Sequence, residues 1–546
     1  MKKRNIFFLA LGLVLLGSCT DLNTIPEGGT LTEEQKREVV EAIPGRLAAD
    51  INGMFAVLSK QYCVFGAASG RDDDHGYPAA AMSWDLNGPD MVGTDDNYNW
   101  FSVASDYADR TYTYANPYMR WAMFYKQIKM ANDVMASIPE DTDNPTLLTY
   151  RGLAHAVRAF DYFSLVQYYQ FTYGPETLDK PAVPIVEPGM TDVTNPRATV
   201  RQVYELIMND IDTALVLLKD YVPTSKSYIS EAVAYGLRAR VNLVMKNYAQ
   251  AALDARKAID LFGGTPYTRE ELMTPGFIDA TDHNWMWALI ITPDVVPDAY
   301  PAWPAVLASF SGDSYTCGVG CYKMINTLLY SIIPATDVRK GWWVDAELKS
   351  PLIDSLSWPE YKGEPLGPLN IPDVKMPYLP YTNVKFGQFG GIGNTVNAGD
   401  WCMMRVEEML LIEAEATGMT DEAAGKNLLT NFVKTYRDPA YTFPASGIKF
   451  QDECWKQRRI ELWGEGFSMM DIMRLKKNIV RFNSRVETNH PEAFRFNLAA
   501  DDGWLLMRIP QREINSNPGI GDEDNNNDGA LPVSGDGAGL RDGVTD

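Results

Sequence analysis

The sequence predicts a mainly α-helical fold: a scaffold of stacked helix pairs with long irregular loop excursions and a few short strands. Apolar residues recur at helical spacing through residues 31–260 and again through residues 401–520. Between these two regions, residues 261–400 are rich in Pro, Gly and aromatic side chains and show no regular period. The chain has 546 residues, 46% of them hydrophobic, so a sizeable core is expected.

The first residues have the pattern of an export signal. Basic residues at positions 2–4 precede an apolar run at residues 6–16, which is too short to span a bilayer. Small residues then lead to Cys19, an order that resembles the bacterial lipobox. We therefore expect residues 1–18 to be a cleaved lipoprotein signal peptide and two or more acyl chains at Cys19 to give stable anchoring. An ordinary signal peptide with an incidental cysteine is the alternative.

A tether and then a series of helices are expected after Cys19. Residues 19–30 are polar and contain Pro and Gly, which is typical of a flexible linker. Thr199 and Gln202 have the spacing of a capping box, which indicates that a helix begins there. An earlier helix is expected to place six apolar or small residues on one face: Trp121, Phe124, Tyr125, Ile128, Ala131 and Met135.

The clearest repeat signal lies between residues 235 and 258. Tyr235, Ala239, Ala251 and Ala258 have the spacing at which tetratricopeptide repeats place aromatic and small residues, with a turn at Asn247. Because small side chains let two helices approach closely, the helix pairs are expected to form a tetratricopeptide-like stack. A second such pair is predicted at residues 401–416 and 421–436.

Two irregular segments, residues 62–118 and 262–400, are the expected location of function. Long irregular segments inside ordered proteins more often carry function than merely connect elements. The apolar face of a sugar stacks on Trp or Tyr, while Asp, Asn and Arg bind its hydroxyl groups. Trp287 has apolar neighbours and is expected in a core strand. For the other rings, the alternative to contact with a ligand is burial in the core. The candidate ligand contacts are Trp84, Tyr98, Trp100, Trp285, Tyr300 and Trp303.

Charge and composition argue against several classes of function. The net charge of −22 makes nucleic acid an improbable partner. With four histidines and no H-E-x-x-H motif, no metal or other cofactor is predicted.

Residues 521–546 are acidic and Asn-rich, so they are predicted to be disordered. Within them, the stretch from Asp524 to Gly529 resembles the start of an EF-hand loop, but its twelfth position is Gly535 and calcium binding is therefore unsupported.

Neither catalysis nor a disulfide framework is predicted. The chain has no G-x-S-x-G motif, P-loop or dinucleotide-binding fingerprint. Glu461 and Glu465 lie one helical turn apart and could serve a glycoside hydrolase, but three nearby arginines, Arg458, Arg459 and Arg474, are expected to neutralise them. Cys317 and Cys321 are close enough in sequence to be bridged, although spacing alone does not decide this.

Several motifs, in this order along the chain, resemble those of the SusD/RagB lipoproteins of the Bacteroidetes outer membrane. The matches span residues 19–518, and their common order makes them specific. Gly464 and Ser468 depart from the usual aromatic and arginine at those positions. The matching segments are Cys19-Thr20-Asp21-Leu22, Trp121 to Asn132, Arg158 to Phe163, Val183-Pro184, Asp337-Val338-Arg339, Arg405 to Ala416, Arg459 to Gly466 and Ile509 to Pro518.

The resemblance implies a lipid-anchored protein on the surface of the outer membrane. Such proteins bind a nutrient, here expected to be an oligosaccharide or polysaccharide, and deliver it to a SusC-type TonB-dependent transporter without chemistry. The resemblance also implies that the helical face docks on the transporter and that the irregular excursions carry the ligand. Members that capture peptides are known in the family, so a peptide- or protein-binding scaffold is the alternative.

Overall fold

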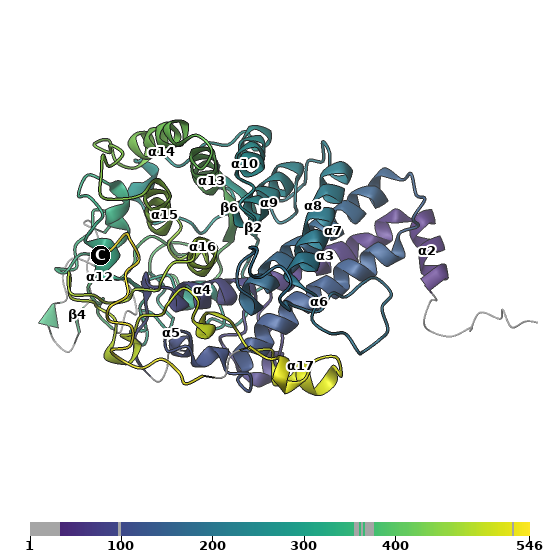
Figure 1. The fold of residues 1–546 in the computed structure, drawn as a ribbon, viewed down its shortest axis with the longest axis horizontal. Helices are drawn as coiled ribbons and strands as arrows, with labels where there is room; N and C mark the ends of the chain where they lie inside the picture. The colour runs from purple at the N-terminus through teal and green to yellow at the C-terminus, as the bar shows by residue number, and fades with distance from the viewer. Residues whose placement is uncertain (1–32, 97–99, 354–359, 362–363, 366–375, 527–528) are drawn as a thin grey trace, which may run out of the picture.

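The structure is a computed structural model, and it describes residues 33–96, 100–353, 360–361, 364–365, 376–526 and 529–546. The predicted signal peptide at residues 1–18, the lipidation site Cys19 and the tether at residues 19–30 lie outside the described residues, and so does Tyr98. Most of the described chain is helical or irregular (Figure 1). The helices are α2 (Glu33–Ala42), α3 (Ala48–Ala56), α4 (Tyr77–Asn87), α5 (Ser102–Ser105), α6 (Ala115–Ser137), α7 (Pro145–Tyr169), α8 (Val200–Leu217), α9 (Glu231–Val244), α10 (Tyr248–Phe262), α11 (Trp303–Val306), α12 (Thr327–Tyr330), α13 (Val406–Gly418), α14 (Glu422–Tyr436), α15 (Phe450–Glu461), α16 (Ser468–Leu475) and α17 (Gln511–Ser516).

The predicted stack of helix pairs is confirmed, although residues 401–405, predicted as the start of a helix, form a strand and the helix begins at Val406. Each of α6, α7, α8, α9, α10, α13 and α14 packs against the next in that order, and Figure 1 shows them as a continuous row. The row continues from α10 to α13 although residues 263–405 separate these helices in the sequence. The scaffold is therefore one stack into which a long excursion has been inserted.

Local sequence signals explain where these helices begin and how closely they pack. The predicted capping box is present. The Thr199 hydroxyl accepts from the backbone N–H of Gln202, and the side-chain carbonyl of Gln202 accepts from the backbone N–H of Thr199. Asn144 caps α7, and Pro145 occupies its first turn. A Cβ on Gly425 would lie 2.3 Å from the Cα of Gly418, so α13 and α14 need glycine where they cross.

A second layer of short helices and irregular chain packs beside the row. Helix α4 contacts α16, and α15 contacts α13. The strands of the described residues form three antiparallel two-stranded sheets, β1 with β3, β2 with β6 and β4 with β5. Trp287 lies in β2 as predicted, and it is fully buried. The strands are β1 (Met91–Val92), β2 (Trp285–Leu289), β3 (Met324–Ile325), β4 (Glu360–Tyr361), β5 (Glu364–Pro365) and β6 (Trp401–Arg405).

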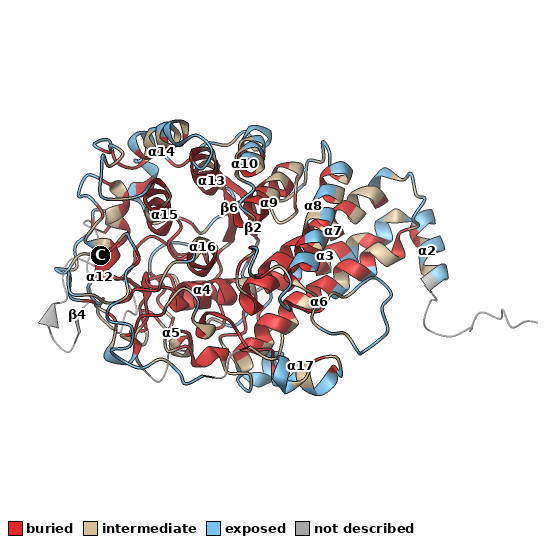
Figure 2. Cartoon of the chain, viewed as in Figure 1, coloured by how far each residue is buried: buried red, intermediate tan, exposed pale blue. Residues whose placement is uncertain are grey.

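One hydrophobic core runs through the described parts of the two helical regions and the excursion, from Val40 to Ile520. Figure 2 shows that buried residues fill the interior of both layers, while exposed residues gather on the outer faces of α2, α10, α14 and α17. A smaller cluster lies between α13, α14 and α15. The excursion therefore shares its core with the helices instead of forming a separate domain.

The C-terminal segment differs from the predicted disorder. Residues 529–546 lie against the body of the molecule. There the backbone N–H of Asn497 donates to the backbone carbonyl of Asp536. Near the end of the chain, the buried carboxylate of Asp542 accepts from Arg459 at 2.8 Å. Acidic, Asn-rich composition was the basis of the predicted disorder, but a buried guanidinium on α15 pairs with a carboxylate of the segment and helps to hold it in place.

Candidate functional site

Three of the predicted ligand contacts are core residues, so the structure corrects the prediction for them. Trp84 faces the interior from α4 and stacks on Tyr168 with ring centres 4.2 Å apart. Trp285 lies in β2 and is 0% exposed. Trp303 begins α11, and its indole nitrogen donates to the carbonyl of Gly399 at 2.7 Å. Aromatic content in the irregular segments could not show which rings face inward, because the core also recruits large apolar side chains.

The two other described candidates, Trp100 and Tyr300, come together on the surface around Tyr315. The indole nitrogen of Trp100 donates to the Tyr315 hydroxyl at 2.8 Å. The rings of Tyr300 and Tyr315 meet edge to face with their centres 5.1 Å apart. Tyr300 is 37% exposed, and Trp100 and Tyr315 are half-buried. These three rings come from residues 100, 300 and 315, so folding of the excursion onto the N-terminal region creates the cluster.

Two carboxylates border the cluster. The Tyr315 hydroxyl donates to Asp72 at 2.6 Å, and the Tyr300 hydroxyl donates to Asp313 at 2.8 Å. Burial, together with the neighbouring Asp73 and Asp298, raises the pKa of Asp72 above its usual range. We call Trp100, Tyr300, Tyr315, Asp72 and Asp313 the aromatic platform. It combines ring surface with carboxylate acceptors, which are the two features that bind the apolar face and the hydroxyl groups of a sugar.

Two buried side chains hold the segments that carry the platform. The Gln61 amide nitrogen donates to the carbonyls of Asp298 at 2.7 Å and Pro301 at 3.0 Å, and so fixes the loop that carries Tyr300. His75 Nδ1 lies 2.9 Å from the carbonyl of Asp72. Burial lowers the pKa of His75 to about 4, so the ring is neutral at pH 7 and its Nδ1–H donates to that carbonyl. The platform is therefore positioned by protein hydrogen bonds.

Sequence reasoning did not select Asp72, Asp313 or Tyr315. Asp72 begins the run Asp72-Asp73-Asp74 inside an irregular segment, which was the one local signal for it. Tyr315 has the same signal as Tyr300, an aromatic ring in an irregular segment, but nothing local distinguishes it from the other rings there. Asp313 has no local signal, because its role depends on its contact with Tyr300. Contacts of this kind can be found only when the fold is known.

A groove of about 1030 Å³ lies on the same molecule, along α6. Its walls are the loop at residues 184–195 and helix α17. Two aromatic residues that line it are held by protein groups: Trp121 is 4% exposed and donates to Glu513, and the Tyr125 hydroxyl donates to the carbonyl of Pro184. These two rings therefore present little free surface to a ligand in the groove.

Comparisons with known proteins agree with this architecture. A family model described as starch-binding associating with outer membrane matches residues 80–243, and the SusD family model matches residues 358–527. Together these segments make up more than half of the chain. A SusD-like protein of Formosa agariphila is 23% identical over 397 residues, which cover 66% of this chain and 73% of that protein. The chain belongs to the SusD family.

Solved structures share the fold of this SusD-family chain. A SusD-like carbohydrate-binding protein from Bacteroides vulgatus has a TM-score of 0.69 at 22% identity, covering 88% of this chain and 97% of its own. A SusD superfamily protein from Parabacteroides distasonis has a TM-score of 0.63 at 17% identity, with coverages of 92% and 100%. A laminarin-binding SusD-like protein has a TM-score of 0.59 at 16% identity, with coverages of 89% and 99%. The helical scaffold and its long excursion are therefore features of the SusD fold.

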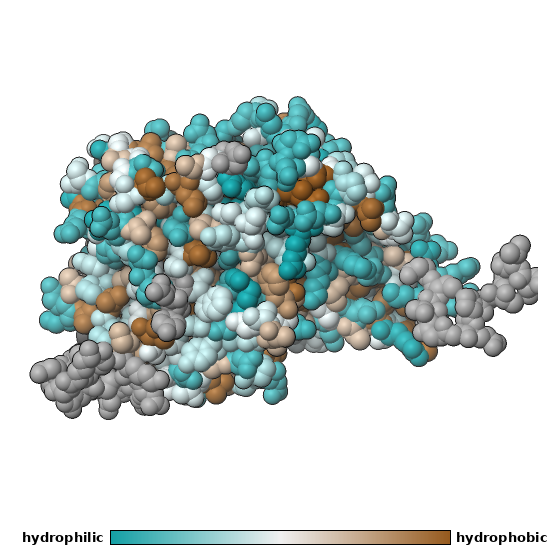
Figure 3. All heavy atoms as spheres, turned by 90° about the horizontal axis from the view of Figure 1, so that it is seen from below, coloured by the Kyte–Doolittle hydropathy of each residue, from teal (hydrophilic) through white to brown (hydrophobic). Residues whose placement is uncertain are grey.

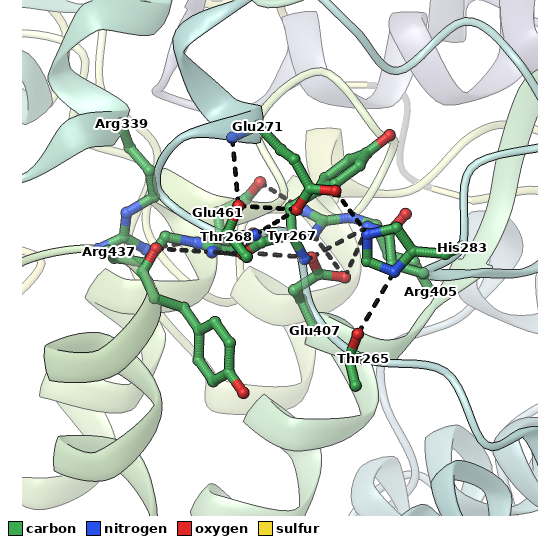
Figure 4. A network of polar contacts seen from close by, with 12 residues as sticks. Thr265, Tyr267, Thr268, Glu271, His283, Arg339, Arg405, Glu407, Arg437 and Glu461 are labelled. Carbon is green, nitrogen blue, oxygen red and sulfur yellow. Dashed lines mark hydrogen bonds and ion pairs between the residues drawn. The ribbon is translucent and has the colours of Figure 1, made fainter.

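The SusD-family motifs around Glu461 form a buried network of charges, which argues against the glycoside hydrolase alternative (Figure 4). Arg405 donates to Glu461 and to Glu465, at 2.8 Å in each case, and Arg437 donates to Glu461 at 2.7 Å. Burial opposes ionisation of Glu461, but Arg437 and Arg405 hold its pKa well below the usual range. A general acid needs a raised pKa and access to substrate, and Glu461 has neither.

The arginines that neutralise Glu461 and Glu465 are not those that the sequence suggested. Arg458 pairs with Asp471, Arg459 with Asp90 and Asp542, and Arg474 with Glu415 and Asp471. Proximity in the sequence was the basis of that prediction. In the structure, Arg405 reaches both glutamates across the fold, Arg437 reaches Glu461 and Lys385 reaches Glu465. The outcome for the carboxylates is the same: both are buried and fully paired.

The remaining polar candidates have structural explanations. Cys317 and Cys321 are free and buried: the Cys317 thiol lies 3.2 Å from the carbonyl of Ser309, and the Cys321 thiol lies 3.1 Å from Asp96. In the described part of the chain, no cluster of three or more His, Cys, Asp or Glu is arranged to hold a metal ion. Among the helices that the structure describes, each is too short or too polar to cross a membrane.

Proposed function

We propose that this chain captures a nutrient glycan at the surface of the outer membrane and delivers it, chemically unchanged, to a SusC-type TonB-dependent transporter. The observation that carries the proposal is the aromatic platform, where exposed or half-buried rings lie beside carboxylate acceptors. Membership of the SusD family supports the same function, and the related proteins include a carbohydrate-binding and a laminarin-binding member. The buried, paired state of Glu461 and Glu465 supports a role without catalysis.

The lipid anchor is the second part of the proposal. The lipobox-like sequence ending in Cys19 supports cleavage after residue 18, acylation of the thiol and a tether of residues 19–30 that holds the folded chain at the membrane. Cells labelled with palmitate should incorporate it into the wild-type chain and not into Cys19→Ser. Equal labelling of both, or a mature N-terminus elsewhere than residue 19, would contradict the anchor.

The binding function is tested with a soluble chain that lacks residues 1–19. Calorimetry against laminarin, starch and xylan should show binding to at least one, with a dissociation constant between micromolar and millimolar, or about −8 to −4 kcal/mol. Trp100→Ala and Tyr300→Ala should each weaken that binding by about tenfold, because each removes a stacking surface. Tyr114→Ala, which changes another exposed aromatic residue outside the platform, is the matched control and should bind as wild type.

Two outcomes separate this function from its alternatives. Binding of a peptide digest, with no binding to any polysaccharide, would favour the peptide-binding scaffold of the same transport complex. Release of shorter sugars by the purified chain would favour a hydrolase, and that activity should then disappear in Glu465→Gln. Recovery of the glycan at its original length supports capture without chemistry.

A further inference from the structure

A row of planar side chains connects the aromatic platform to the groove along α6. The guanidinium carbon of Arg71 lies 5.4 Å from the ring centre of Trp100 and 5.9 Å from that of Phe65. Phe65 and Tyr118 follow with ring centres 5.7 Å apart. Arg71 therefore lies over the platform's Trp100 and over the next ring in the row.

Arg512 extends the row into the groove. Its guanidinium carbon lies 5.1 Å from the ring centre of Phe65 and 4.5 Å from that of Tyr118. Tyr118 and Arg512 are both lining residues of the groove, and Arg512 projects from α17, which forms one wall. The platform and the groove are thus joined by cation–π and ring contacts without a break. We call Arg71, Phe65, Arg512 and Tyr118 the connecting row.

The connecting row reaches the surface along its whole length. Arg512 is exposed, and Arg71, Phe65 and Tyr118 are half-buried, in contrast to the buried Trp84, Trp285 and Trp303. Figure 3 views the molecule from below, the side on which α17 lies in Figure 1, and shows apolar residues scattered among polar ones on this face. Such a mixed surface suits a ligand that has both apolar ring faces and hydroxyl groups at its edges.

The groove offers polar groups at the far end of the row. Asn195, Glu513 and Asn517 line it, together with Asp133 and Lys129. Amides, carboxylates and ammonium groups are the side chains that bind sugar hydroxyls. Its volume of about 1030 Å³ lies at the upper end of ligand sites. A monosaccharide held on the platform would leave both the row and the groove unused.

We propose that the connecting row and the groove form a second subsite for the same glycan, so that the ligand is an extended polysaccharide chain running from the platform to α6. This inference rests on the proposed function, because it assigns the platform to one end of the chain. When one sugar unit of a chain is bound at the platform, the neighbouring units of the same chain are held at a high effective concentration near the connecting row. Their contacts with the row are then intramolecular, so each one adds to the affinity. The ligand class is therefore a long chain, and short fragments bind at the platform alone.

The test is a chain-length series. Oligosaccharides from disaccharide to octasaccharide, prepared from laminarin, starch and xylan, are titrated into the soluble chain that lacks residues 1–19. For the glycan that binds, affinity should rise with length by about twofold to tenfold for each added ring contact, and then level off. Arg512→Ala and Tyr118→Ala should remove most of this rise while leaving the affinity of the shortest binding fragment unchanged.

Three controls keep the result interpretable. Tyr114→Ala, an exposed ring next to the start of α6 that does not line the groove, should retain the full length dependence. Trp100→Ala should weaken every length equally, because it acts at the platform. If Tyr118→Ala loses folded structure by circular dichroism, Arg512→Ala decides alone, since Arg512 is exposed.

The outcomes separate this inference from the function on which it rests. Binding of short fragments with the same affinity as long ones, or an unchanged length dependence in Arg512→Ala, would overturn the second subsite and leave the proposed function standing. Absence of binding to fragments and polymers of all three glycans would overturn both.

Discussion

Asp161 provides a sharp test of the structure, because its carboxyl group is buried in α7 without a partner. The residue is 0% exposed, and neither of its carboxylate oxygens has a hydrogen-bond partner among the described residues. Burial raises its pKa well above the usual range, so the carboxyl is neutral in the folded protein. In the unfolded chain the pKa of an aspartate is about 3.9, and the group ionises in neutral solution.

The pH dependence of Asp161 follows from this difference in pKa. The folded state holds a proton that the unfolded state releases, so this group destabilises the fold progressively as pH rises above about 4, until the folded pKa is reached. The change in unfolding free energy is about 1.4 kcal/mol per pH unit over that range. Asp161→Asn removes the titration, so its stability relative to wild type should increase from pH 5 towards pH 8, by about 1.4 kcal/mol for each pH unit below the folded pKa.

Urea denaturation at pH 5 and pH 8, followed by circular dichroism, measures this change. Asp210→Asn is the matched control, because Asp210 is also buried but accepts from Arg158 at 2.7 Å and 2.8 Å. That substitution should destabilise the protein by about 1.5–3 kcal/mol, since it removes hydrogen bonds to a charged group. A stability difference between Asp161→Asn and wild type that stays constant with pH would refute the reasoning about the buried carboxyl.

Three further predictions concern the platform, the charge network and the C-terminal segment. Gln61→Leu should weaken glycan binding several-fold, because it frees the loop at residues 298–301. Unchanged affinity of the folded variant in calorimetry would show that Gln61 does not position this loop. Glu465→Gln should lower the unfolding free energy by about 3 kcal/mol, because it breaks a buried ion pair, and a neutral result in urea denaturation would contradict the network. Asp542→Ala should destabilise the protein by about 1–3 kcal/mol by depriving Arg459 of one partner, whereas disorder of the segment predicts no change in the melting temperature.

The scaffold could be predicted from the sequence because its signals are local. Helical periodicity, the capping box at Thr199 and Gln202, and small residues such as Ala239 and Ala251 each act within one helix or one helix pair. Trp287 was placed in a core strand because its immediate neighbours are apolar. In these cases the residues that decide the structure are close together in the sequence.

The platform could be predicted only in part, because it is assembled from distant segments. Trp100 and Tyr300 were selected by residue type alone, and the same criterion also selected the buried Trp84, Trp285 and Trp303. Whether a ring faces solvent depends on what packs against it, as Tyr168 does on Trp84. No pattern in a single sequence records such a contact.

The C-terminal segment shows a second limit of composition. An acidic, Gly-rich stretch lacks the apolar residues that normally order a chain, which is why disorder was predicted. The segment is held by long-range contacts with the body of the molecule. They include the ion pair of Asp542 with the buried Arg459, which α15 provides more than eighty residues earlier, and the hydrogen bond from the backbone N–H of Asn497 to the carbonyl of Asp536.

The measurement that tests the central claim most directly is calorimetry of the soluble chain with laminarin, starch and xylan, followed by chromatography of the recovered glycan. The account predicts that at least one glycan binds the wild-type chain, that the double substitution of Trp100 and Tyr300 by alanine weakens this binding by about a hundredfold, and that the glycan is recovered at its original length. Equal binding by the double variant, or recovery of shortened chains, would contradict the claim that the platform captures a glycan without altering it.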